Sequence, residues 1–106
     1  MQEITASELK AKLDSGEDIQ IIDVRQPDEY AIARIAGAKL IPLAEIINRM
    51  SEIDDERDTV VHCHTGFRSS RAIQALQHYG FSGNLANLRG GIAAWSDEVD
   101  PNVPRY

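Results

Sequence analysis

Cysteine is nearly absent from this sequence, because Cys63 is the only one among 106 residues. A single cysteine cannot form an internal disulfide, so its thiol is free, as is usual in a reducing compartment. Long apolar runs are also missing, since no stretch approaches the roughly 20 residues that cross a bilayer. The start, M-Q-E-I-T-A-S-E, has neither the basic end nor the apolar stretch of a signal peptide. We therefore expect a cytoplasmic protein without a membrane partner.

Positive charge is scarce as well: 11 Lys and Arg against 17 Asp and Glu give a net charge of −6. An acidic body repels nucleic acid, so no nucleic-acid partner is expected. The basic residues are unevenly placed, however, because Arg68 and Arg71 closely follow the cysteine and His62 and His64 adjoin it. A local basic spot on an acidic protein indicates a small anionic ligand. For Arg71 alone, an ordinary solvated helix residue is the simpler interpretation.

The length and composition suit one domain over residues 1–106. Apolar residues make up 42% and charged residues 26%, as in an ordinary globular protein. No repeat, low-complexity tract or linker divides the chain. We expect a single folded unit with one modest core.

Helical and strand-like patterns alternate along the chain. Thr5 and Glu8 have the spacing of a capping box before the first helix, and Pro27 suits the first position of a second one. Parallel strands need crossover connections, so the alternation implies an α/β domain with a mainly parallel sheet. We expect helices over residues 6–15, 27–33, 43–53, 69–79 and 90–95, and strands over 19–24, 40–41, 59–62 and 84–88.

The cysteine lies where such a sheet binds ligands, beyond the carboxyl end of a strand. After Cys63, a loop through Arg68 leads into a helix, so backbone N–H groups and the positive end of the helix can face the sulfur. Cysteines in such settings have pKa values below the usual one. Gly66 suits a tight turn, and Ser69 or Ser70 can cap the next helix. The pattern favours a reactive thiolate over the commoner buried, purely structural cysteine.

Other catalytic chemistries find less support. His62, Cys63 and His64 offer metal-binding atoms, but consecutive strand residues point to opposite faces, and no second cysteine or H-x-x-x-H pair completes a set. A serine hydrolase is disfavoured because no G-x-S-x-G sequence is present. We expect neither a metal nor another cofactor.

Four stretches together resemble the successive signatures of single-domain rhodanese-like sulfurtransferases: I-I-D-V-R-Q-P-D-E-Y, I-A-G-A, V-V-H-C-H-T-G-F-R-S-S-R-A and L-R-G-G-I-A-A-W. The resemblance implies the rhodanese fold, with a five-stranded, mainly parallel sheet flanked by helices on both faces. It also implies that Cys63 is a catalytic nucleophile that carries sulfur as a persulfide. The sulfur would pass from a small anionic donor such as thiosulfate to a thiol, cyanide or a sulfur-carrier protein.

The resemblance also implies a set of substrate-binding residues. Asp23 and Arg25 would help to order the loop or bind an anion, although a structural ion pair, with Glu29 as a further partner, is an equally good interpretation. The full set is His64, Thr65, Gly66, Phe67 and Arg68 in the loop, with Asp23 and Arg25 at the end of the neighbouring strand.

Two departures from the family pattern stand out. Residues 33–38 read A-R-I-A-G-A where many members have G-H-I-P-G-A, which affects local loop geometry but not the fold. His64 follows the cysteine where Arg or Lys is frequent, and histidine is only partly charged near pH 7, so substrate affinity is expected to be lower.

Two alternatives to sulfur transfer remain. Phosphatases with related loops place five residues between cysteine and arginine, whereas four separate Cys63 from Arg68, and the phosphatase arginine position holds Ser69. The shorter ring favours a persulfide sulfur over a phosphoryl group. A non-catalytic binding module is the other alternative, since many rhodanese-like domains lack the cysteine that this chain retains.

The tail D-P-N-V-P-R-Y, with E-Y-A-I-A-R-I-A-G-A and C-H-T-G-F-R-S, is similar to the C-terminal rhodanese domains of ubiquitin-activating-like adenylyltransferases. Those domains serve molybdopterin and thiamine biosynthesis and tRNA thiolation. The similarity implies either an excised domain or a free-standing relative, with a ubiquitin-like sulfur-carrier protein as acceptor. A generic thiosulfate sulfurtransferase that uses small thiols is nearly as well supported.

Overall fold

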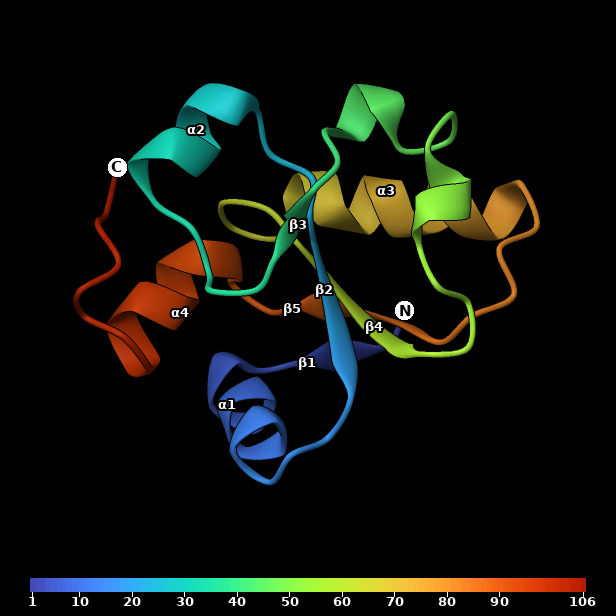
Figure 1. The fold of residues 1–106 in the computed structure, drawn as a ribbon. Coiled ribbons are helices and arrows are strands. Elements are labelled where there is room, and N and C mark those ends of the chain that lie inside the picture. Colours follow the sequence, from blue (N-terminus) through green and yellow to red (C-terminus); the bar gives the residue numbers. More distant parts are fainter.

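The computed structural model describes all residues from 1 to 106, and its centre is one five-stranded sheet (Figure 1). The strands lie in the order β1-β5-β4-β2-β3, and every pair is parallel. Parallel pairing confirms the expected α/β class and places all carboxyl ends of the strands at one edge. The strands are β1 Glu3–Ile4, β2 Ile19–Asp23, β3 Lys39–Leu40, β4 Asp58–His62 and β5 Leu85–Leu88.

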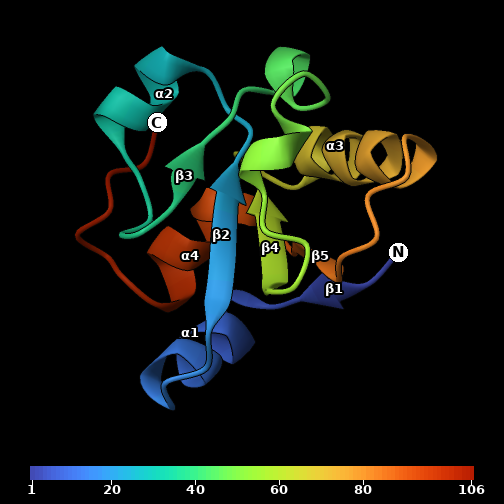
Figure 2. The same cartoon turned by 45° about the vertical axis from the view of Figure 1, so that its right-hand side comes forward.

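Helices cover both faces of the sheet, as expected (Figure 2). Helices α1 and α4 share one apolar core with the sheet, and α3 packs on the opposite face. Alternate strand residues supply the two cores: Ile21 and Val60 face the first, and Ile22 and Val61 face the second. The helices are α1 Ala6–Asp14, α2 Pro27–Ile32, α3 Phe67–His78 and α4 Gly91–Glu98.

Local sequence signals explain where the first two helices begin. Thr5 caps α1, because its Oγ1 accepts a 3.1 Å hydrogen bond from the Glu8 N–H while its own N–H donates to Glu8 Oε1 at 2.9 Å. Pro27 occupies the first turn of α2, and the Gln26 N–H donates to Glu29 Oε1 at 3.0 Å. Both predicted helix starts are confirmed.

The segment 43–53 corrects an expectation, because it is not one helix. It forms two short 3₁₀ turns, Leu43–Glu45 and Met50–Glu52, joined by further turns. The middle of the segment, I-I-N, consists of poor helix formers. Ile46 and Ile53 are buried in the α3-side core, so packing holds the irregular path in place.

Two further boundaries differ from the expected ones. Helix α3 begins at Phe67, so the last two residues of the cysteine loop form its first turn. Neither Ser69 nor Ser70 is the N-cap, which is Gly66. Strand β1 is two residues long and was not expected, because so short a segment has no measurable alternation.

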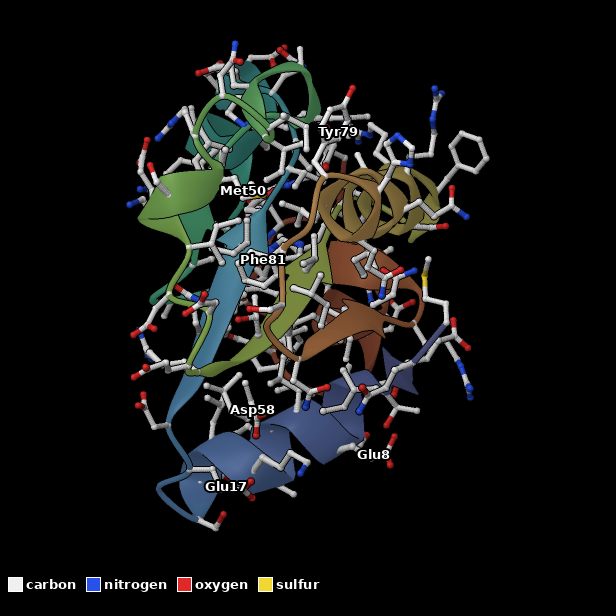
Figure 3. All side chains as sticks on the ribbon, turned by 90° about the vertical axis from the view of Figure 1, so that its right-hand side faces the viewer. Glu8, Glu17, Met50, Asp58, Tyr79 and Phe81 are labelled. Carbon is white, nitrogen blue, oxygen red and sulfur yellow. The ribbon has the colours of Figure 1, made fainter.

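The labelled side chains mark two ends of the molecule (Figure 3). Asp58 and Glu8 lie at the amino-terminal end of the strands, near α1, while Met50 and Phe81 pack against the α3-side core. No helix has both the length and the apolar character needed to cross a membrane.

Candidate active site

Cys63 lies immediately after β4, the central strand of the sheet, at the carboxyl edge. The side chain is 1% exposed, so its sulfur sits inside the loop that leads to α3. The Gly66 N–H donates to Sγ at 3.1 Å, and the Ser69 hydroxyl lies 3.4 Å from it. The cysteine is therefore recessed and surrounded by hydrogen-bond donors, as expected from the loop sequence.

The pKa of Cys63 reflects two opposing effects. Burial raises it, but hydrogen bonds from the Ser69 hydroxyl and from the N–H groups of Ser69, Gly66 and Thr65 lower it. The net result is a pKa below the ordinary value. A thiolate is thus stabilised by backbone groups and one hydroxyl.

Asn87 on β5 fixes the Gly66 and Ser69 groups that surround the cysteine sulfur. Its Nδ2 donates to the Gly66 carbonyl at 3.0 Å, which fixes the amide orientation, and its Oδ1 accepts from the Ser69 hydroxyl at 2.6 Å. The Ser69 hydroxyl has one proton to share between Asn87 and Cys63. Sequence reasoning missed Asn87, which no local motif near the cysteine indicates.

Two glycines are required by the loop geometry. Gly66 has a φ of +113°, in the left-handed region that other residues rarely adopt. A Cβ on Gly91 would lie 2.4 Å from the His64 carbonyl oxygen and 2.6 Å from that of Cys63. The next N–H groups of α4 hold the same two carbonyls: the Ile92 N–H donates to the Cys63 carbonyl at 2.9 Å, and the Ala93 N–H donates to the His64 carbonyl at 3.1 Å. Gly91 thus lets α4 approach the cysteine loop closely enough to support it.

Asp23 and Arg25 form a fully buried ion pair next to β4. Arg25 Nε lies 2.9 Å from Asp23 Oδ1, and Nη2 lies 2.7 Å from Oδ2; both side chains have no exposed surface. Arg25 Nη2 also donates to the Ala33 carbonyl at 2.6 Å, within the segment that departs from the family pattern. The geometry is that of the structural ion pair weighed above, with no atom of either side chain open to a ligand.

A second ion pair lies above the first, at the mouth of the loop. Arg68 donates from Nη1 and Nη2 to the two carboxylate oxygens of Glu29, at 2.6 and 2.9 Å. Tyr106 joins the two pairs, because its hydroxyl donates to Glu29 Oε2 at 2.8 Å and accepts from Arg25 Nη1 at 2.9 Å. Its ring stacks on His64, with centroids 4.2 Å apart.

The other expected site residues are more open. Phe67 is 71% exposed, and Thr65 is exposed as well. His62 is fully buried, with Nε2 3.7 Å from Asp23 Oδ2, and burial lowers its pKa, which favours the neutral ring. The structure therefore brings Cys63 together with the loop backbone and leaves Phe67 and Thr65 at the surface.

The parallel sheet and the recessed cysteine define an α/β protein with a cradle of N–H groups for an anionic sulfur. The family of rhodanese-like domains matches residues 5–98, and this chain belongs to that family. The resemblance inferred from the sequence is thereby confirmed, together with the fold class.

Individual relatives agree. The chain is 41% identical to "Probable adenylyltransferase/sulfurtransferase MoeZ" of Mycobacterium tuberculosis, over 97% of this chain but only 26% of that protein. It is also 41% identical to "Sulfurtransferase" of Allochromatium vinosum, over 97% of this chain and 95% of the relative. The structure of a rhodanese-like domain protein from Staphylococcus aureus superposes with a TM-score of 0.84 at 34% identity, covering 93% of this chain and 95% of that one.

Proposed function

We propose that this protein is a sulfurtransferase that carries sulfane sulfur as a persulfide on Cys63. The Cys63 thiolate attacks the outer sulfur of a donor, the donor's S–S bond breaks, and the leaving group departs with the electron pair. With thiosulfate, sulfite leaves and the negative charge stays on the outer sulfur of Cys63–S–S⁻. A thiolate acceptor then attacks that outer sulfur, which restores the Cys63 thiolate.

One observation carries this proposal: the Cys63 sulfur lies in a ring of N–H and O–H donors that lower its pKa. The same ring suits the persulfide, because that group is also an anion at the end of the same side chain. The N–H groups of residues 64–68 would stabilise both forms without moving. Donors that are already in place stabilise charge without a cost of reorganisation during the reaction.

The acceptor in this proposal is a thiol, or the adenylated C-terminal tail of a sulfur-carrier protein, whose acyl carbon the terminal sulfur of the persulfide attacks with loss of AMP. The name of the MoeZ relative joins adenylyl transfer to sulfur transfer in one chain, which supports a carrier acceptor. A hollow of about 150 Å³ lies beside His64, between α4 and Tyr106, next to the cysteine loop. Phosphate hydrolysis is the second candidate, disfavoured by the four residues between Cys63 and Arg68.

The first prediction is that sulfur transfer requires Cys63. After incubation with thiosulfate, or with a singly charged donor such as methanethiosulfonate, intact-protein mass spectrometry should show one added sulfur that cyanide removes. Cys63→Ser should lose the adduct and at least roughly a thousandfold of the turnover, because the nucleophile is gone.

An aryl phosphate serves as the competing substrate. Turnover of the phosphate that matches the sulfur-transfer rate and disappears in Cys63→Ser would reverse the ranking of the two activities. Absence of any sulfur adduct with every donor would refute the proposed function.

A further inference from the structure

The only arginine of the cysteine loop, Arg68, is already engaged. Its two terminal nitrogens meet both oxygens of Glu29, a bidentate geometry that is among the strongest ionic contacts in proteins. The side chains are only 31% and 16% exposed, so solvent screens the pair incompletely. An anionic substrate must therefore compete with a carboxylate that is held in place.

Glu29 is held by more than Arg68. The Gln26 N–H donates to Oε1 at 3.0 Å and the Tyr106 hydroxyl donates to Oε2 at 2.8 Å. The hydrogen bonds from Arg68, despite some opposition from burial, lower the pKa of Glu29 to about 2. Glu29 is consequently ionised throughout any ordinary assay range. Protonation therefore does not break its ion pair with Arg68.

Arg25 and Arg68 are both already paired with carboxylates. Arg25 is neutralised by Asp23 beneath the loop, and Arg68 by Glu29 at its mouth. Arg71, one turn further along α3, is exposed and forms no ion pair, so it is the remaining cation on that helix. The cradle itself offers uncharged N–H donors, which accommodate one negative sulfur. A second negative charge on the donor finds no free partner within the loop.

We propose that Glu29 is a specificity-determining residue which, by clamping Arg68, disfavours dianionic donors such as thiosulfate relative to donors with a single negative charge, such as persulfides and thiosulfonates. Tyr106 is the positioning residue that supports the clamp. This inference rests on the proposed function of Cys63 and refines its donor class.

The transfer from a singly charged donor balances without any further reactant. With methanethiosulfonate, the Cys63 thiolate forms a bond to the terminal sulfur, the sulfur–sulfur bond of the donor breaks, and methanesulfinate leaves with the electron pair. The product is Cys63–S–S⁻, the same persulfide that thiosulfate gives. The two donors therefore differ at the reacting end chiefly in one charge, which makes them a matched pair.

The test compares kcat/KM for these two donors in four proteins: the wild type, Glu29→Gln, Asp28→Asn and Glu29→Gln/Arg68→Gln. Glu29→Gln frees Arg68, and should raise kcat/KM for thiosulfate about tenfold through a lower KM, equivalent to about 1.4 kcal/mol. The value for methanethiosulfonate should change less than about twofold. Asp28→Asn removes one charge from the same helix start without touching Arg68, and its amide oxygen can still accept the Glu29 N–H, so neither donor should change appreciably.

The double variant identifies the group that is released. Without Arg68, the gain for thiosulfate should disappear, so Glu29→Gln/Arg68→Gln should return close to the wild-type value. Added salt should raise the thiosulfate KM of Glu29→Gln more steeply than that of the wild type, because a free guanidinium is then the binding partner. Tyr106→Phe loosens the clamp without changing charge, and should produce a smaller gain of two- to threefold for thiosulfate, roughly what one weakened hydrogen bond is worth.

Several results would overturn the proposal. One is a fall in thiosulfate kcat/KM in Glu29→Gln, which would show that Glu29 orients Arg68 for the donor. Another is an equal gain for both donors, or a gain equalled by Asp28→Asn, which would show a general charge effect. If Glu29→Gln does not fold, Tyr106→Phe decides by the same donor ratio. Failure of the proposed function is distinct, because then neither donor would load sulfur on Cys63 in any variant.

Discussion

The two ends of the parallel sheet differ in how they use charge. At the carboxyl end, Asp23 and Arg25 pair with no exposed surface, and Arg68 pairs with a largely covered Glu29. At the amino end, where β2 and β4 begin, Asp18 and Arg57 form a pair in which both side chains are well exposed. A hollow of about 240 Å³ at that end is larger than the one beside the cysteine loop. Buried, multiply bonded ion pairs, and not the size of a hollow, therefore distinguish the end of the sheet that carries the cysteine loop.

The largest effect on stability should come from breaking the interior pair. Arg25→Met leaves the Asp23 carboxylate buried without its partner, which should lower the free energy of unfolding by about 3–5 kcal/mol. Arg57→Met removes the exposed partner of Asp18 at the other end and should cost less than about 1 kcal/mol. Urea denaturation of both variants measures the contrast. Equal losses would mean that burial does not distinguish the two ends.

A smaller effect, mainly on kinetics, is expected from Ser69→Ala. The change also leaves the buried Asn87 Oδ1 without its donor, which costs some stability. The hydroxyl is the first of the groups that lower the pKa of Cys63, so its removal should raise that pKa. The thiolate fraction then falls at acidic pH and recovers as pH rises, and the activity profile should move to higher pH. We expect a several-fold loss of kcat/KM on the acidic side and near wild-type values on the alkaline side. A uniform loss at every pH would indicate instead that Ser69 acts through the loop structure.

The smallest effect belongs to the amino end. Thr5→Ala removes the side-chain cap of α1 and should lower the free energy of unfolding by about 1 kcal/mol. Sulfur transfer should be unaffected, because α1 lies at the end of the sheet opposite to Cys63. Thr5→Ser, which keeps the hydroxyl, is the matched control and should retain most of the stability. A change in kcat/KM in Thr5→Ala would show that the two ends are coupled.

The features that the sequence predicted are local ones. The capping box at Thr5 and Glu8, Pro27 at the start of α2, and the glycine beside the cysteine are all set by residues a few positions apart. Their physical causes operate within one turn of chain, so a spacing rule captures them. The same holds for the alternation of strands and helices, which fixes the parallel sheet.

The features that sequence reasoning missed are contacts between distant residues. Glu29 meets Arg68 across 39 positions and Tyr106 across 77, and no local pattern reports either contact. Asn87 is similar, because its role depends on β5 lying beside β4. In the segment 43–53, tertiary packing of Ile46 and Ile53 prevailed over an apparently helical spacing.

The support of the cysteine loop by backbone groups has an evolutionary consequence. The carbonyls of Cys63 and His64 are held by N–H groups of α4, and the close approach depends on Gly91. Mutation of the cysteine side chain removes the acceptor of the Gly66 N–H but leaves these backbone contacts in place. Selection for folding acts on the glycines and selection for chemistry acts on the sulfur, so a lineage with this fold can lose its catalysis while keeping its shape.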